Sequence, residues 1–393
     1  MKDGCVKLTP MTDEMYRLYF REYENDPDMY WKKRGFSSSG KTRISNIIGS
    51  TGKPTMPALA EGALFVSELT KLLVLEDRDV FDLHATQDLR ACCDITLMDQ
   101  FSPVDAIVRQ APDAEILLAN PTISVKKELI DALPELRLIQ TEGVGFEGVD
   151  LDAARDRGIY VCNCRGVNAQ AVAEHAVMLM LCCLREVING HQDVLEGRQN
   201  DKKVYYMKTG SLRELGDCTV GFIGYGAIGR EAARLTKAFG AKTLFYTPHP
   251  KQDEFARYCP LDELLAESDI VSLNLPLTKE TENMADAAFF SKMKDGAILI
   301  NTARGGLVNS RDLIAAIAGG KLGGAGLDVL DNEPVRRDHV LVTAQEEVRR
   351  KIIFTPHIGG VSASSFVRTY QIITDNIRRV RRGERPVNIV NGL

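Results

Sequence analysis

Three side chains with complementary chemistry stand at the ends of three successive apolar segments toward the C-terminus. They are Arg304, Glu333 and His357. An arginine can bind a carboxylate through two parallel hydrogen bonds. A histidine beside a carboxylate is a proton donor whose pKa is raised by the neighbouring charge. Separately they could be unrelated surface residues, but together they would form a site that binds an acid and delivers a proton.

A glycine-rich turn lies between the apolar run 220–223 and a segment with apolar residues at helical spacing. It reads Gly224-Tyr-Gly226-Ala-Ile-Gly229. Between a strand and a helix, the first glycine permits a tight turn, the second lets backbone approach a pyrophosphate, and the third lets the helix pack on the strand. The helix N-terminus adds free N–H groups and partial positive charge. This context predicts a dinucleotide site, whereas the glycines alone would indicate only a turn.

The next strand, 243–246, ends where an Asp or Glu normally binds the ribose hydroxyls of the dinucleotide. Here Thr247 occupies that position, and His249 and Lys251 follow closely. No carboxylate is present to repel a 2′-phosphate, and two potentially cationic side chains lie nearby. We therefore expect NADP to be favoured over NAD, unless His249 and Lys251 are merely solvated.

Apolar segments alternate with helical periodicity from residue 71 onward, which predicts parallel sheets covered on both faces. Ligands of such sheets bind outside the carboxyl ends of the strands, so the three polar residues should converge on the nucleotide crevice. The glycines of Gly143-Val144-Gly145 would leave N–H groups free for a carboxylate, although an ordinary turn is as good an interpretation. The predicted strands are 72–75, 95–98, 115–119, 137–140, 158–162, 220–223, 243–246, 269–278, 297–306, 324–329 and 351–354.

A helix predicted over 168–187 is apolar almost all round and should be buried. His175 within it is expected to be a satisfied core or interface residue rather than a ligand.

The composition excludes several classes of function. The 393 residues allow two to three domains, and 49 basic against 54 acidic side chains give a net charge of −5, with no electrostatic case for binding nucleic acid or an anionic membrane. Nine cysteines show neither zinc-site nor disulfide spacing, which favours reduced thiols and no metal. The longest apolar stretch, 176–184, is too short for a bilayer, and no signal peptide is evident. We expect a soluble, cytoplasmic protein.

The first 69 residues do not resemble the start of a dinucleotide enzyme. Residues 8–28 resemble the first strand and helix of GNAT-type acetyltransferases, but the acetyl-CoA loop of that family does not follow. The stretch 35–42 matches the phosphate-loop pattern GxxxxGK[ST], yet a charged segment precedes it and glycines and a proline follow. We expect an extension, either a fusion remnant or a linker, that is dispensable.

Six motifs in order make residues of about 70 to 393 similar to the D-isomer-specific 2-hydroxyacid dehydrogenase family. They are Gly143-Val-Gly145, Val172-Ala-Glu174-His175, the glycine turn, Asn301-Thr-Ala-Arg304-Gly305, Asp328 with Glu333-Pro334, and Thr355-Pro-His357-Ile-Gly359-Gly360. The resemblance implies two doubly wound α/β domains and a homodimer. A Rossmann NAD(P) domain over 171–357 would be inserted into a flavodoxin-like substrate domain made of 70–170 and 358–393.

The resemblance also implies roles for individual residues in hydride transfer between a nicotinamide and a small 2-hydroxy or 2-oxo acid. Arg304 would bind carboxylate and carbonyl oxygen, His357 would be the acid in reduction and the base in oxidation, and Glu333 would orient and tune His357. The Val144 and Gly145 N–H groups would hold the substrate carboxylate, and Asp328 would orient the nicotinamide amide. The implied cofactor contacts are Gly224, Tyr225, Gly226, Ala227, Ile228, Gly229, Thr247, His249, Pro276, Thr281, Thr302, Ala303, Arg304, Asp328 and His357.

The substrate is predicted from the start of the glycine loop. Phosphoglycerate dehydrogenases of the family commonly carry an arginine there, whereas this chain has Gln140-Thr141-Glu142, and Glu142 should repel a phosphate. We expect an unphosphorylated 2-oxo acid such as glyoxylate, hydroxypyruvate or pyruvate, with phosphoglycerate as the second candidate. A different class of function, the NAD-sensing scaffold of C-terminal-binding-protein corepressors, is the remaining alternative, and acetyl transfer is the weakest.

Overall fold

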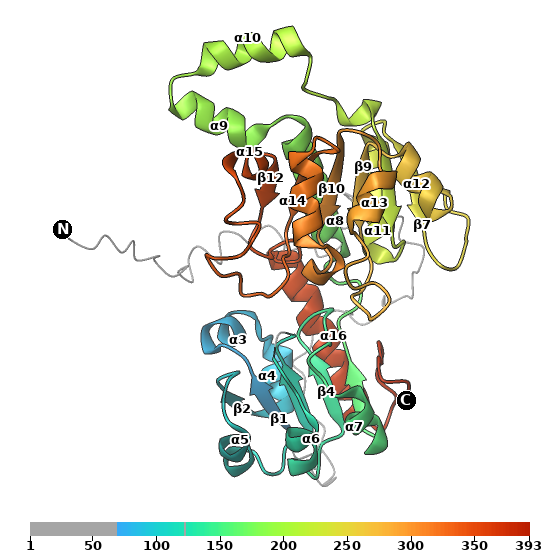
Figure 1. Cartoon of the computed structure of the whole chain (residues 1–393). Coiled ribbons are helices and arrows are strands. Elements are labelled where there is room, and N and C mark those ends of the chain that lie inside the picture. Colours follow the sequence, from blue (N-terminus) through green and yellow to red (C-terminus); the bar gives the residue numbers. More distant parts are fainter. Residues whose placement is uncertain (1–68, 122) are drawn as a thin grey trace, which may run out of the picture. The chain divides into compact units, whose positions relative to one another are not determined.

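Two parallel β-sheets organise the computed structural model, which describes residues 69–121 and 123–393 (Figure 1). One sheet has five strands in the order β2-β1-β3-β4-β5, and the other has seven in the order β12-β11-β10-β9-β6-β7-β8. The predicted α/β class with two doubly wound sheets is therefore confirmed. The expectations for residues 1–68, including the acetyltransferase resemblance and the phosphate-loop match, fall outside the described residues.

The central strands of the five-stranded sheet are buried on both faces, so they are mostly apolar runs rather than alternating ones. Leu73, Leu117 and Ile139 pack on one face, while Leu72, Val74 and other residues of the same strands pack on the opposite face. The strands are β1 Thr70–Leu75, β2 Cys93–Met98, β3 Ile116–Ala119, β4 Leu138–Thr141 and β5 Tyr160–Cys162. The helices after them are α3 Arg78–His84, α4 Gln87–Cys92, α5 Val104–Gln110, α6 Lys127–Ala132 and α7 Leu151–Asp156.

The last helix, α16 Ala363–Arg381, packs against this sheet although it is far from it in sequence. Tyr370, Ile373, Ile377 and Val380 of α16 share a core with Leu72. A capping box formed by Ser362 and Ser365 fixes the start of the helix. The C-terminal segment thus completes the five-stranded sheet's core, while the division of the chain at 170 and 357 stays a prediction.

The seven-stranded sheet is covered on one face by α8 Ala169–Leu184 and α11 Ala227–Ala238. Its strands are β6 Thr219–Ile223, β7 Lys242–Tyr246, β8 Arg257–Tyr258, β9 Ile270–Leu273, β10 Ala297–Asn301, β11 Leu322–Leu327 and β12 Ile352–Phe354. The other face is covered by α12 Leu261–Glu267, α13 Ala287–Lys292 and α14 Ser310–Ala318, and α15 Glu346–Arg349 precedes β12.

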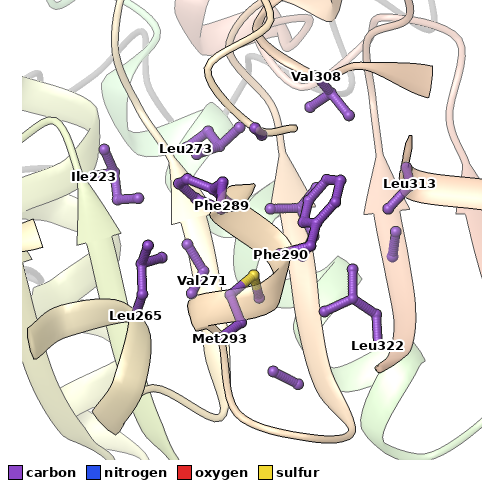
Figure 2. Packing of buried hydrophobic residues seen from close by; sticks show 14 of the residues in the cluster. Ile223, Leu265, Val271, Leu273, Phe289, Phe290, Met293, Val308, Leu313 and Leu322 are labelled. Atoms are coloured by element: carbon purple, nitrogen blue, oxygen red, sulfur yellow. The ribbon is translucent and has the colours of Figure 1, made fainter. Parts of the chain in front are cut away.

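The core beneath α13 is built from aromatic and aliphatic side chains (Figure 2). Phe289, Phe290 and Met293 at α13 face Val271 and Leu273 of β9 in the centre of the sheet. Burial of such side chains contributes about 1.5–3 kcal/mol each relative to exposure. This packing holds β9 and its neighbours rigidly, which matters because the polar residues of interest follow these strands.

Two helices, α9 Val187–Leu195 and α10 Gln199–Thr209, follow α8 as a separate arm of the chain (Figure 1). Helix α8 ends at Leu184, earlier than the predicted end at 187. It ends there because Glu186 adopts a left-handed conformation with φ 47° that breaks the helix. The arm is unusual in carrying several exposed apolar side chains, including Ile188, Leu195 and Met207. Nowhere in the described part of the chain is a helix both long enough and apolar enough to cross a bilayer.

Candidate active site

The glycine turn lies where the strand order reverses, because β6 pairs with β7 on one side and with β9 on the other. Gly224 has φ +88°, and a Cβ there would lie 2.3 Å from the carbonyl oxygen of Asn274. A Cβ on Gly229 would lie 2.4 Å from the Gly224 oxygen, so close packing of helix on strand excludes a side chain. A Cβ on Gly226 would meet nothing within 4 Å. Gly226 is thus not required by packing, and its open face suits a ligand that approaches the backbone.

The helix that starts at this turn presents an uncapped N-terminus. Gly226 is the N-cap of α11 and supplies no side-chain cap, so the first N–H groups of Ala227 and Ile228 have no side chain to accept from them. A helix of 12 residues oriented in this way favours an anion at its N-terminus. The buried Oδ1 of Asn274, a residue that packs on Gly224 and Gly229, has no hydrogen-bond partner among the described residues, and neither has the buried Oγ1 of Thr302 after β10. The turn therefore fits a dinucleotide.

The polar side chains beyond the turn are engaged with one another. The Tyr225 ring stacks on Phe245 at 3.9 Å, and its hydroxyl donates to Asp253 Oδ1 at 2.9 Å. Arg230 donates to the other oxygen of Asp253 at 2.7 Å, and Lys251 Nζ donates to the Tyr225 carbonyl at 2.8 Å. Lys251 thus lies at the glycine turn, which agrees with its predicted place beside the ribose site. Its ammonium group, however, already donates to an acceptor of the protein.

Of the other predicted ribose contacts, Thr247 directly follows β7 and is half-buried, while His249 is exposed. Pro276 and Thr281 lie in the loop after β9, where the Thr281 hydroxyl donates to the Pro276 carbonyl at 2.9 Å. The predicted strand 269–278 ends at Leu273, and this hydrogen-bonded loop takes its place. No group of His, Cys, Asp and Glu residues in 69–121 and 123–393 is arranged to hold a metal ion.

His357 and Glu333 form a hydrogen-bonded pair at the carboxyl ends of β12 and β11. Nδ1 of His357 donates to Glu333 Oε2 at 2.6 Å, and Glu333 Oε1 accepts from the Leu330 N–H at 3.0 Å. The hydrogen bond and charge of Glu333 raise the pKa of His357, although burial opposes this. Burial alone would raise the pKa of Glu333, but the bonds from His357 and Leu330 lower it. Glu333 therefore favours the protonated form of the imidazole, and Nε2 is the ring nitrogen that does not face this carboxylate.

Asp328 anchors the turn that presents His357. It is buried, and its carboxylate accepts from the Thr355 hydroxyl at 2.6 Å, the Ile358 N–H at 3.0 Å and the Gly359 N–H at 2.8 Å. Burial would raise its pKa, but these bonds and that of His175 lower it strongly. His357 itself has φ +56°, an uncommon conformation for a non-glycine residue that these contacts maintain. The role of Asp328 toward a nicotinamide stays a prediction.

His175 is a satisfied interior residue, as expected from the sequence. Its Nε2 lies 2.8 Å from the Thr355 hydroxyl and 3.3 Å from Asp328 Oδ1. Helix α8 therefore contributes to the same anchoring network instead of supplying a ligand.

Arg304 is presented by a tightly pinned loop after β10. The buried Asn301 side chain accepts from the Ala303 N–H at 3.0 Å and donates to the Arg304 carbonyl at 2.9 Å. A Cβ on the following Gly305 would lie 1.9 Å from the Leu330 carbonyl carbon, so the loop packs directly on the backbone that precedes Glu333. The arginine and the Glu333–His357 pair are thus brought together, as the strand order predicts.

The glycine loop after β4 faces Arg304. Gly143 and Gly145 pack on Pro121, which a Cβ on Gly143 would approach to 2.8 Å. A Cβ on Gly145 would lie 3.2 Å from Arg304 Nη2. The N–H groups of Val144 and Gly145 donate no hydrogen bond to any residue in the described part of the chain. Two free N–H groups beside a guanidinium are suited to a carboxylate.

One acidic residue of this loop was not predicted. Glu147 Oε1 accepts from Arg304 Nε at 3.0 Å, across a separation of 157 residues in sequence. The only signal in the sequence is an acidic residue two positions after Gly145 in a loop expected to bind an anion, and the residue types alone do not say where such a side chain points.

The expectation for Glu142 is wrong. Its carboxylate is buried beside Glu76 and Tyr370 instead of facing the ligand crevice. Burial and the neighbouring Glu76 raise the pKa of Glu142 to about 8, so the side chain is mostly neutral at pH 7. The repulsion of a phosphate that its sequence position suggested therefore does not arise.

Comparison with known proteins agrees with this geometry. A model of the NAD-binding domain of D-isomer-specific 2-hydroxyacid dehydrogenases matches residues 177–359. The hydroxypyruvate reductase of Thermotoga maritima is 34% identical over 73% of this chain and 91% of that protein. The chain belongs to the D-isomer-specific 2-hydroxyacid dehydrogenase family. It is accordingly an NAD(P)-dependent oxidoreductase that acts on the CH–OH group of a 2-hydroxy acid.

Other members of the family show a similar relationship. A glyoxylate reductase of Pyrococcus furiosus is 33% identical over 74% of this chain and 86% of its own length. The crystal structure of apo D-mandelate dehydrogenase from Rhodotorula graminis, 28% identical, superposes with a TM-score of 0.72 over 82% of this chain and 98% of that one. A D-3-phosphoglycerate dehydrogenase of Archaeoglobus fulgidus is 34% identical, but only 53% of its length is covered. The acetyltransferase resemblance of the first residues gains no support.

Proposed function

We propose that the protein reduces a small unphosphorylated 2-oxo acid, with glyoxylate and hydroxypyruvate as the leading candidates. The observation that carries this proposal is the convergence of Arg304, the His357–Glu333 pair and the free N–H groups of Val144 and Gly145. The similar proteins named hydroxypyruvate and glyoxylate reductase support the same substrate class.

Each residue of the site would have a separate role in the reduction of the 2-oxo acid. When bound, the nicotinamide supplies the hydride that reaches the carbonyl carbon. Negative charge then develops on the carbonyl oxygen, where the Arg304 guanidinium stabilises it and His357 Nε2 donates a proton. The N–H groups of Val144 and Gly145 hold the carboxylate, and Glu333 favours the protonated form of His357.

The absence of a cation at the start of the glycine loop supports an unphosphorylated substrate. Gln140 and Thr141 are buried, and Gln140 is held by Asn376 at 2.8 Å and by neighbouring carbonyls. None of residues 140–148 is a lysine or arginine. A phosphate on the substrate would therefore find no charge partner in this loop, and phosphoglycerate remains the weaker candidate.

We further propose that NADP is the preferred cofactor. Support comes from Thr247 in place of a ribose-binding acid and from the exposed His249 beside it. Lys251 contributes less than the sequence suggested, because it already donates to the Tyr225 carbonyl.

A homodimer and a cytoplasmic location are also proposed. The exposed apolar side chains of the α9–α10 arm support a second copy as partner, since such a surface is usually covered. All eight described cysteines are free thiols, which suits a reducing compartment.

A substrate panel tests the proposal. We would measure kcat/KM for glyoxylate, hydroxypyruvate, pyruvate and phosphohydroxypyruvate with NADH and NADPH in parallel. Highest values for glyoxylate or hydroxypyruvate are expected. A preference for phosphohydroxypyruvate would support the phosphoglycerate candidate, and cofactor binding without turnover of any acid would support the scaffold.

A further inference from the structure

We propose that Glu147 is a positioning residue for Arg304, which it holds by the Nε–H so that the outer nitrogen Nη2 faces the Val144–Gly145 loop. The inference rests on the proposed function, because it concerns how that site binds the carboxylate of a 2-oxo acid.

The guanidinium of Arg304 is fixed at two of its three nitrogens. Nε donates to Glu147 Oε1 at 3.0 Å, and Nη1 donates to the Ala303 carbonyl at 2.8 Å. Because a guanidinium is planar, these two bonds set the orientation of the whole group. The third nitrogen, Nη2, has no partner within 69–121 and 123–393 and lies 3.2 Å from where a Cβ of Gly145 would stand. The guanidinium nitrogen that has no partner among the described residues is therefore the one beside the Val144–Gly145 loop.

Glu147 is itself held by the loop from which it comes. Its Oε2 accepts from the Phe146 N–H at 2.9 Å, while Oε1 binds Arg304. A Cβ on Gly145 would lie only 3.1 Å from Oε2, so the absence of a side chain at Gly145 leaves room for the carboxylate. Burial would raise the pKa of Glu147, but the charge of Arg304 and the two hydrogen bonds lower it. The side chain is thus ionised at neutral pH and stays paired with Arg304.

A carboxylate on Arg304 could also compete with the substrate carboxylate, but the contacts favour positioning. Glu147 uses only the Nε edge, and a guanidinium has five N–H donors, so those of Nη2 and one of Nη1 remain for the substrate. Without Glu147 the long side chain would have to be ordered by the substrate itself, at a cost in conformational entropy. Glu147 would therefore improve substrate binding instead of opposing it.

The test compares Glu147→Ala and Glu147→Gln with a matched control. Asp131→Asn removes an exposed ion pair with Lys127, 2.9 Å long, on α6 and outside the site. We would measure kcat/KM for glyoxylate, the Kd of NADPH, the melting temperature, and the Kd of oxamate in the presence of NADPH. Oxamate carries a carboxylate and an adjacent carbonyl but is not reduced, so its binding needs no turnover.

Glu147→Ala is expected to lower kcat/KM and to weaken oxamate binding by about tenfold to a hundredfold. This is the size of effect expected when a substrate-binding group is misplaced. Glu147→Gln should recover much of this loss, because its amide oxygen still accepts from Arg304 Nε. The Kd of NADPH, the melting temperature and the basic limb of the pH profile should not change, because Glu333 and not Glu147 controls His357.

Three results would overturn the proposal. Tighter oxamate binding by Glu147→Ala would show that Glu147 competes with the substrate. Unchanged oxamate binding would show that the Glu147–Arg304 ion pair does not contribute to substrate binding. A lower melting temperature together with weaker NADPH binding would show that Glu147 has a structural role. A wild-type enzyme that reduces none of the four acids would refute the proposed function separately, since the oxamate measurement would still report on Glu147.

Discussion

At the scale of single residues, the site depends on which charge each side chain carries at neutral pH. Glu333 raises the pKa of His357 and so favours its cationic form, and four donors lower the pKa of Asp328 and keep it anionic although it is buried. Glu142, in contrast, is kept neutral by its burial beside another carboxylate. These opposite shifts of pKa have measurable consequences for activity and for stability.

Glu333→Gln should move the basic limb of the reduction pH profile to lower pH. The folded pKa of His357 is raised, so the protonated donor is present below that pKa and is lost as the pH rises through it. Removing the carboxylate removes the main cause of the shift. Activity at pH 8 should fall by about tenfold or more, within the ~10²–10⁴-fold contribution of the proton donor itself. A pH profile identical to that of wild type would exclude Glu333 from this role.

Glu142→Gln should stabilise the protein at alkaline pH but not at pH 5. Its folded pKa is about 8 against 4.5 for an unperturbed side chain, so the folded state retains a proton that the unfolded chain releases. The free energy of unfolding therefore decreases as the pH rises from about 4.5 to about 8. The glutamine lacks this penalty, and the melting temperature at pH 8.5 should rise by roughly 2–6 °C.

Differential scanning calorimetry at pH 5 and pH 8.5 measures this difference. Glu128→Gln, on the exposed face of α6, is the control and should shift neither value. An equal change at both pH values would mean that packing and not ionisation sets the stability at Glu142.

At the scale of elements, strand ends and the loops after them create the site. The loops after β10, β11 and β12 carry Arg304, Glu333 and His357, and their glycines and buried polar side chains hold them against one another. The loops after β6 and β7 carry the residues predicted to bind the nucleotide.

Thr247→Asp, at the end of β7, should shift preference toward NAD. A carboxylate there would accept from the ribose 2′-hydroxyl and repel a 2′-phosphate. The ratio of kcat/KM with NADPH to that with NADH should fall by about tenfold to a hundredfold, equivalent to ~1.4–2.7 kcal/mol. Ser291→Asp, which adds the same charge on the exposed side of α13, should leave the ratio unchanged. Strong preference of the wild type for NAD would contradict the interpretation of Thr247.

At the scale of the whole molecule, buried residues within 69–121 and 123–393 pack on both faces of both sheets. The four clusters of buried residues in the described part of the chain include the contribution of α16 to the first sheet. A chain that starts at Leu69 should therefore keep the kcat/KM and, within about 2 °C, the melting temperature of the full-length protein. Loss of folding or of activity in the shortened protein would show that the first 68 residues are needed.

The sequence by itself determined the class of fold, the glycine turn and the three residues at successive strand ends. These features are local, because an apolar run, a glycine with positive φ or a polar residue directly after a strand depends on neighbours in sequence. In a parallel sheet the carboxyl ends of the strands lie at the same edge, so residues that follow successive strands are expected to lie close together. For this reason the amino-acid sequence alone was enough to predict Arg304, Glu333 and His357 as one site.

Tertiary structure alone decided what the remaining polar side chains do. Glu147 meets Arg304 across 157 residues, and Glu142 turns toward Glu76 and Tyr370 instead of the crevice. Both are glutamates of the same loop, so residue type and spacing could not separate them. Their charges differ because one lies beside a guanidinium and the other beside a carboxylate, and such neighbours are set by packing between elements that are distant in sequence.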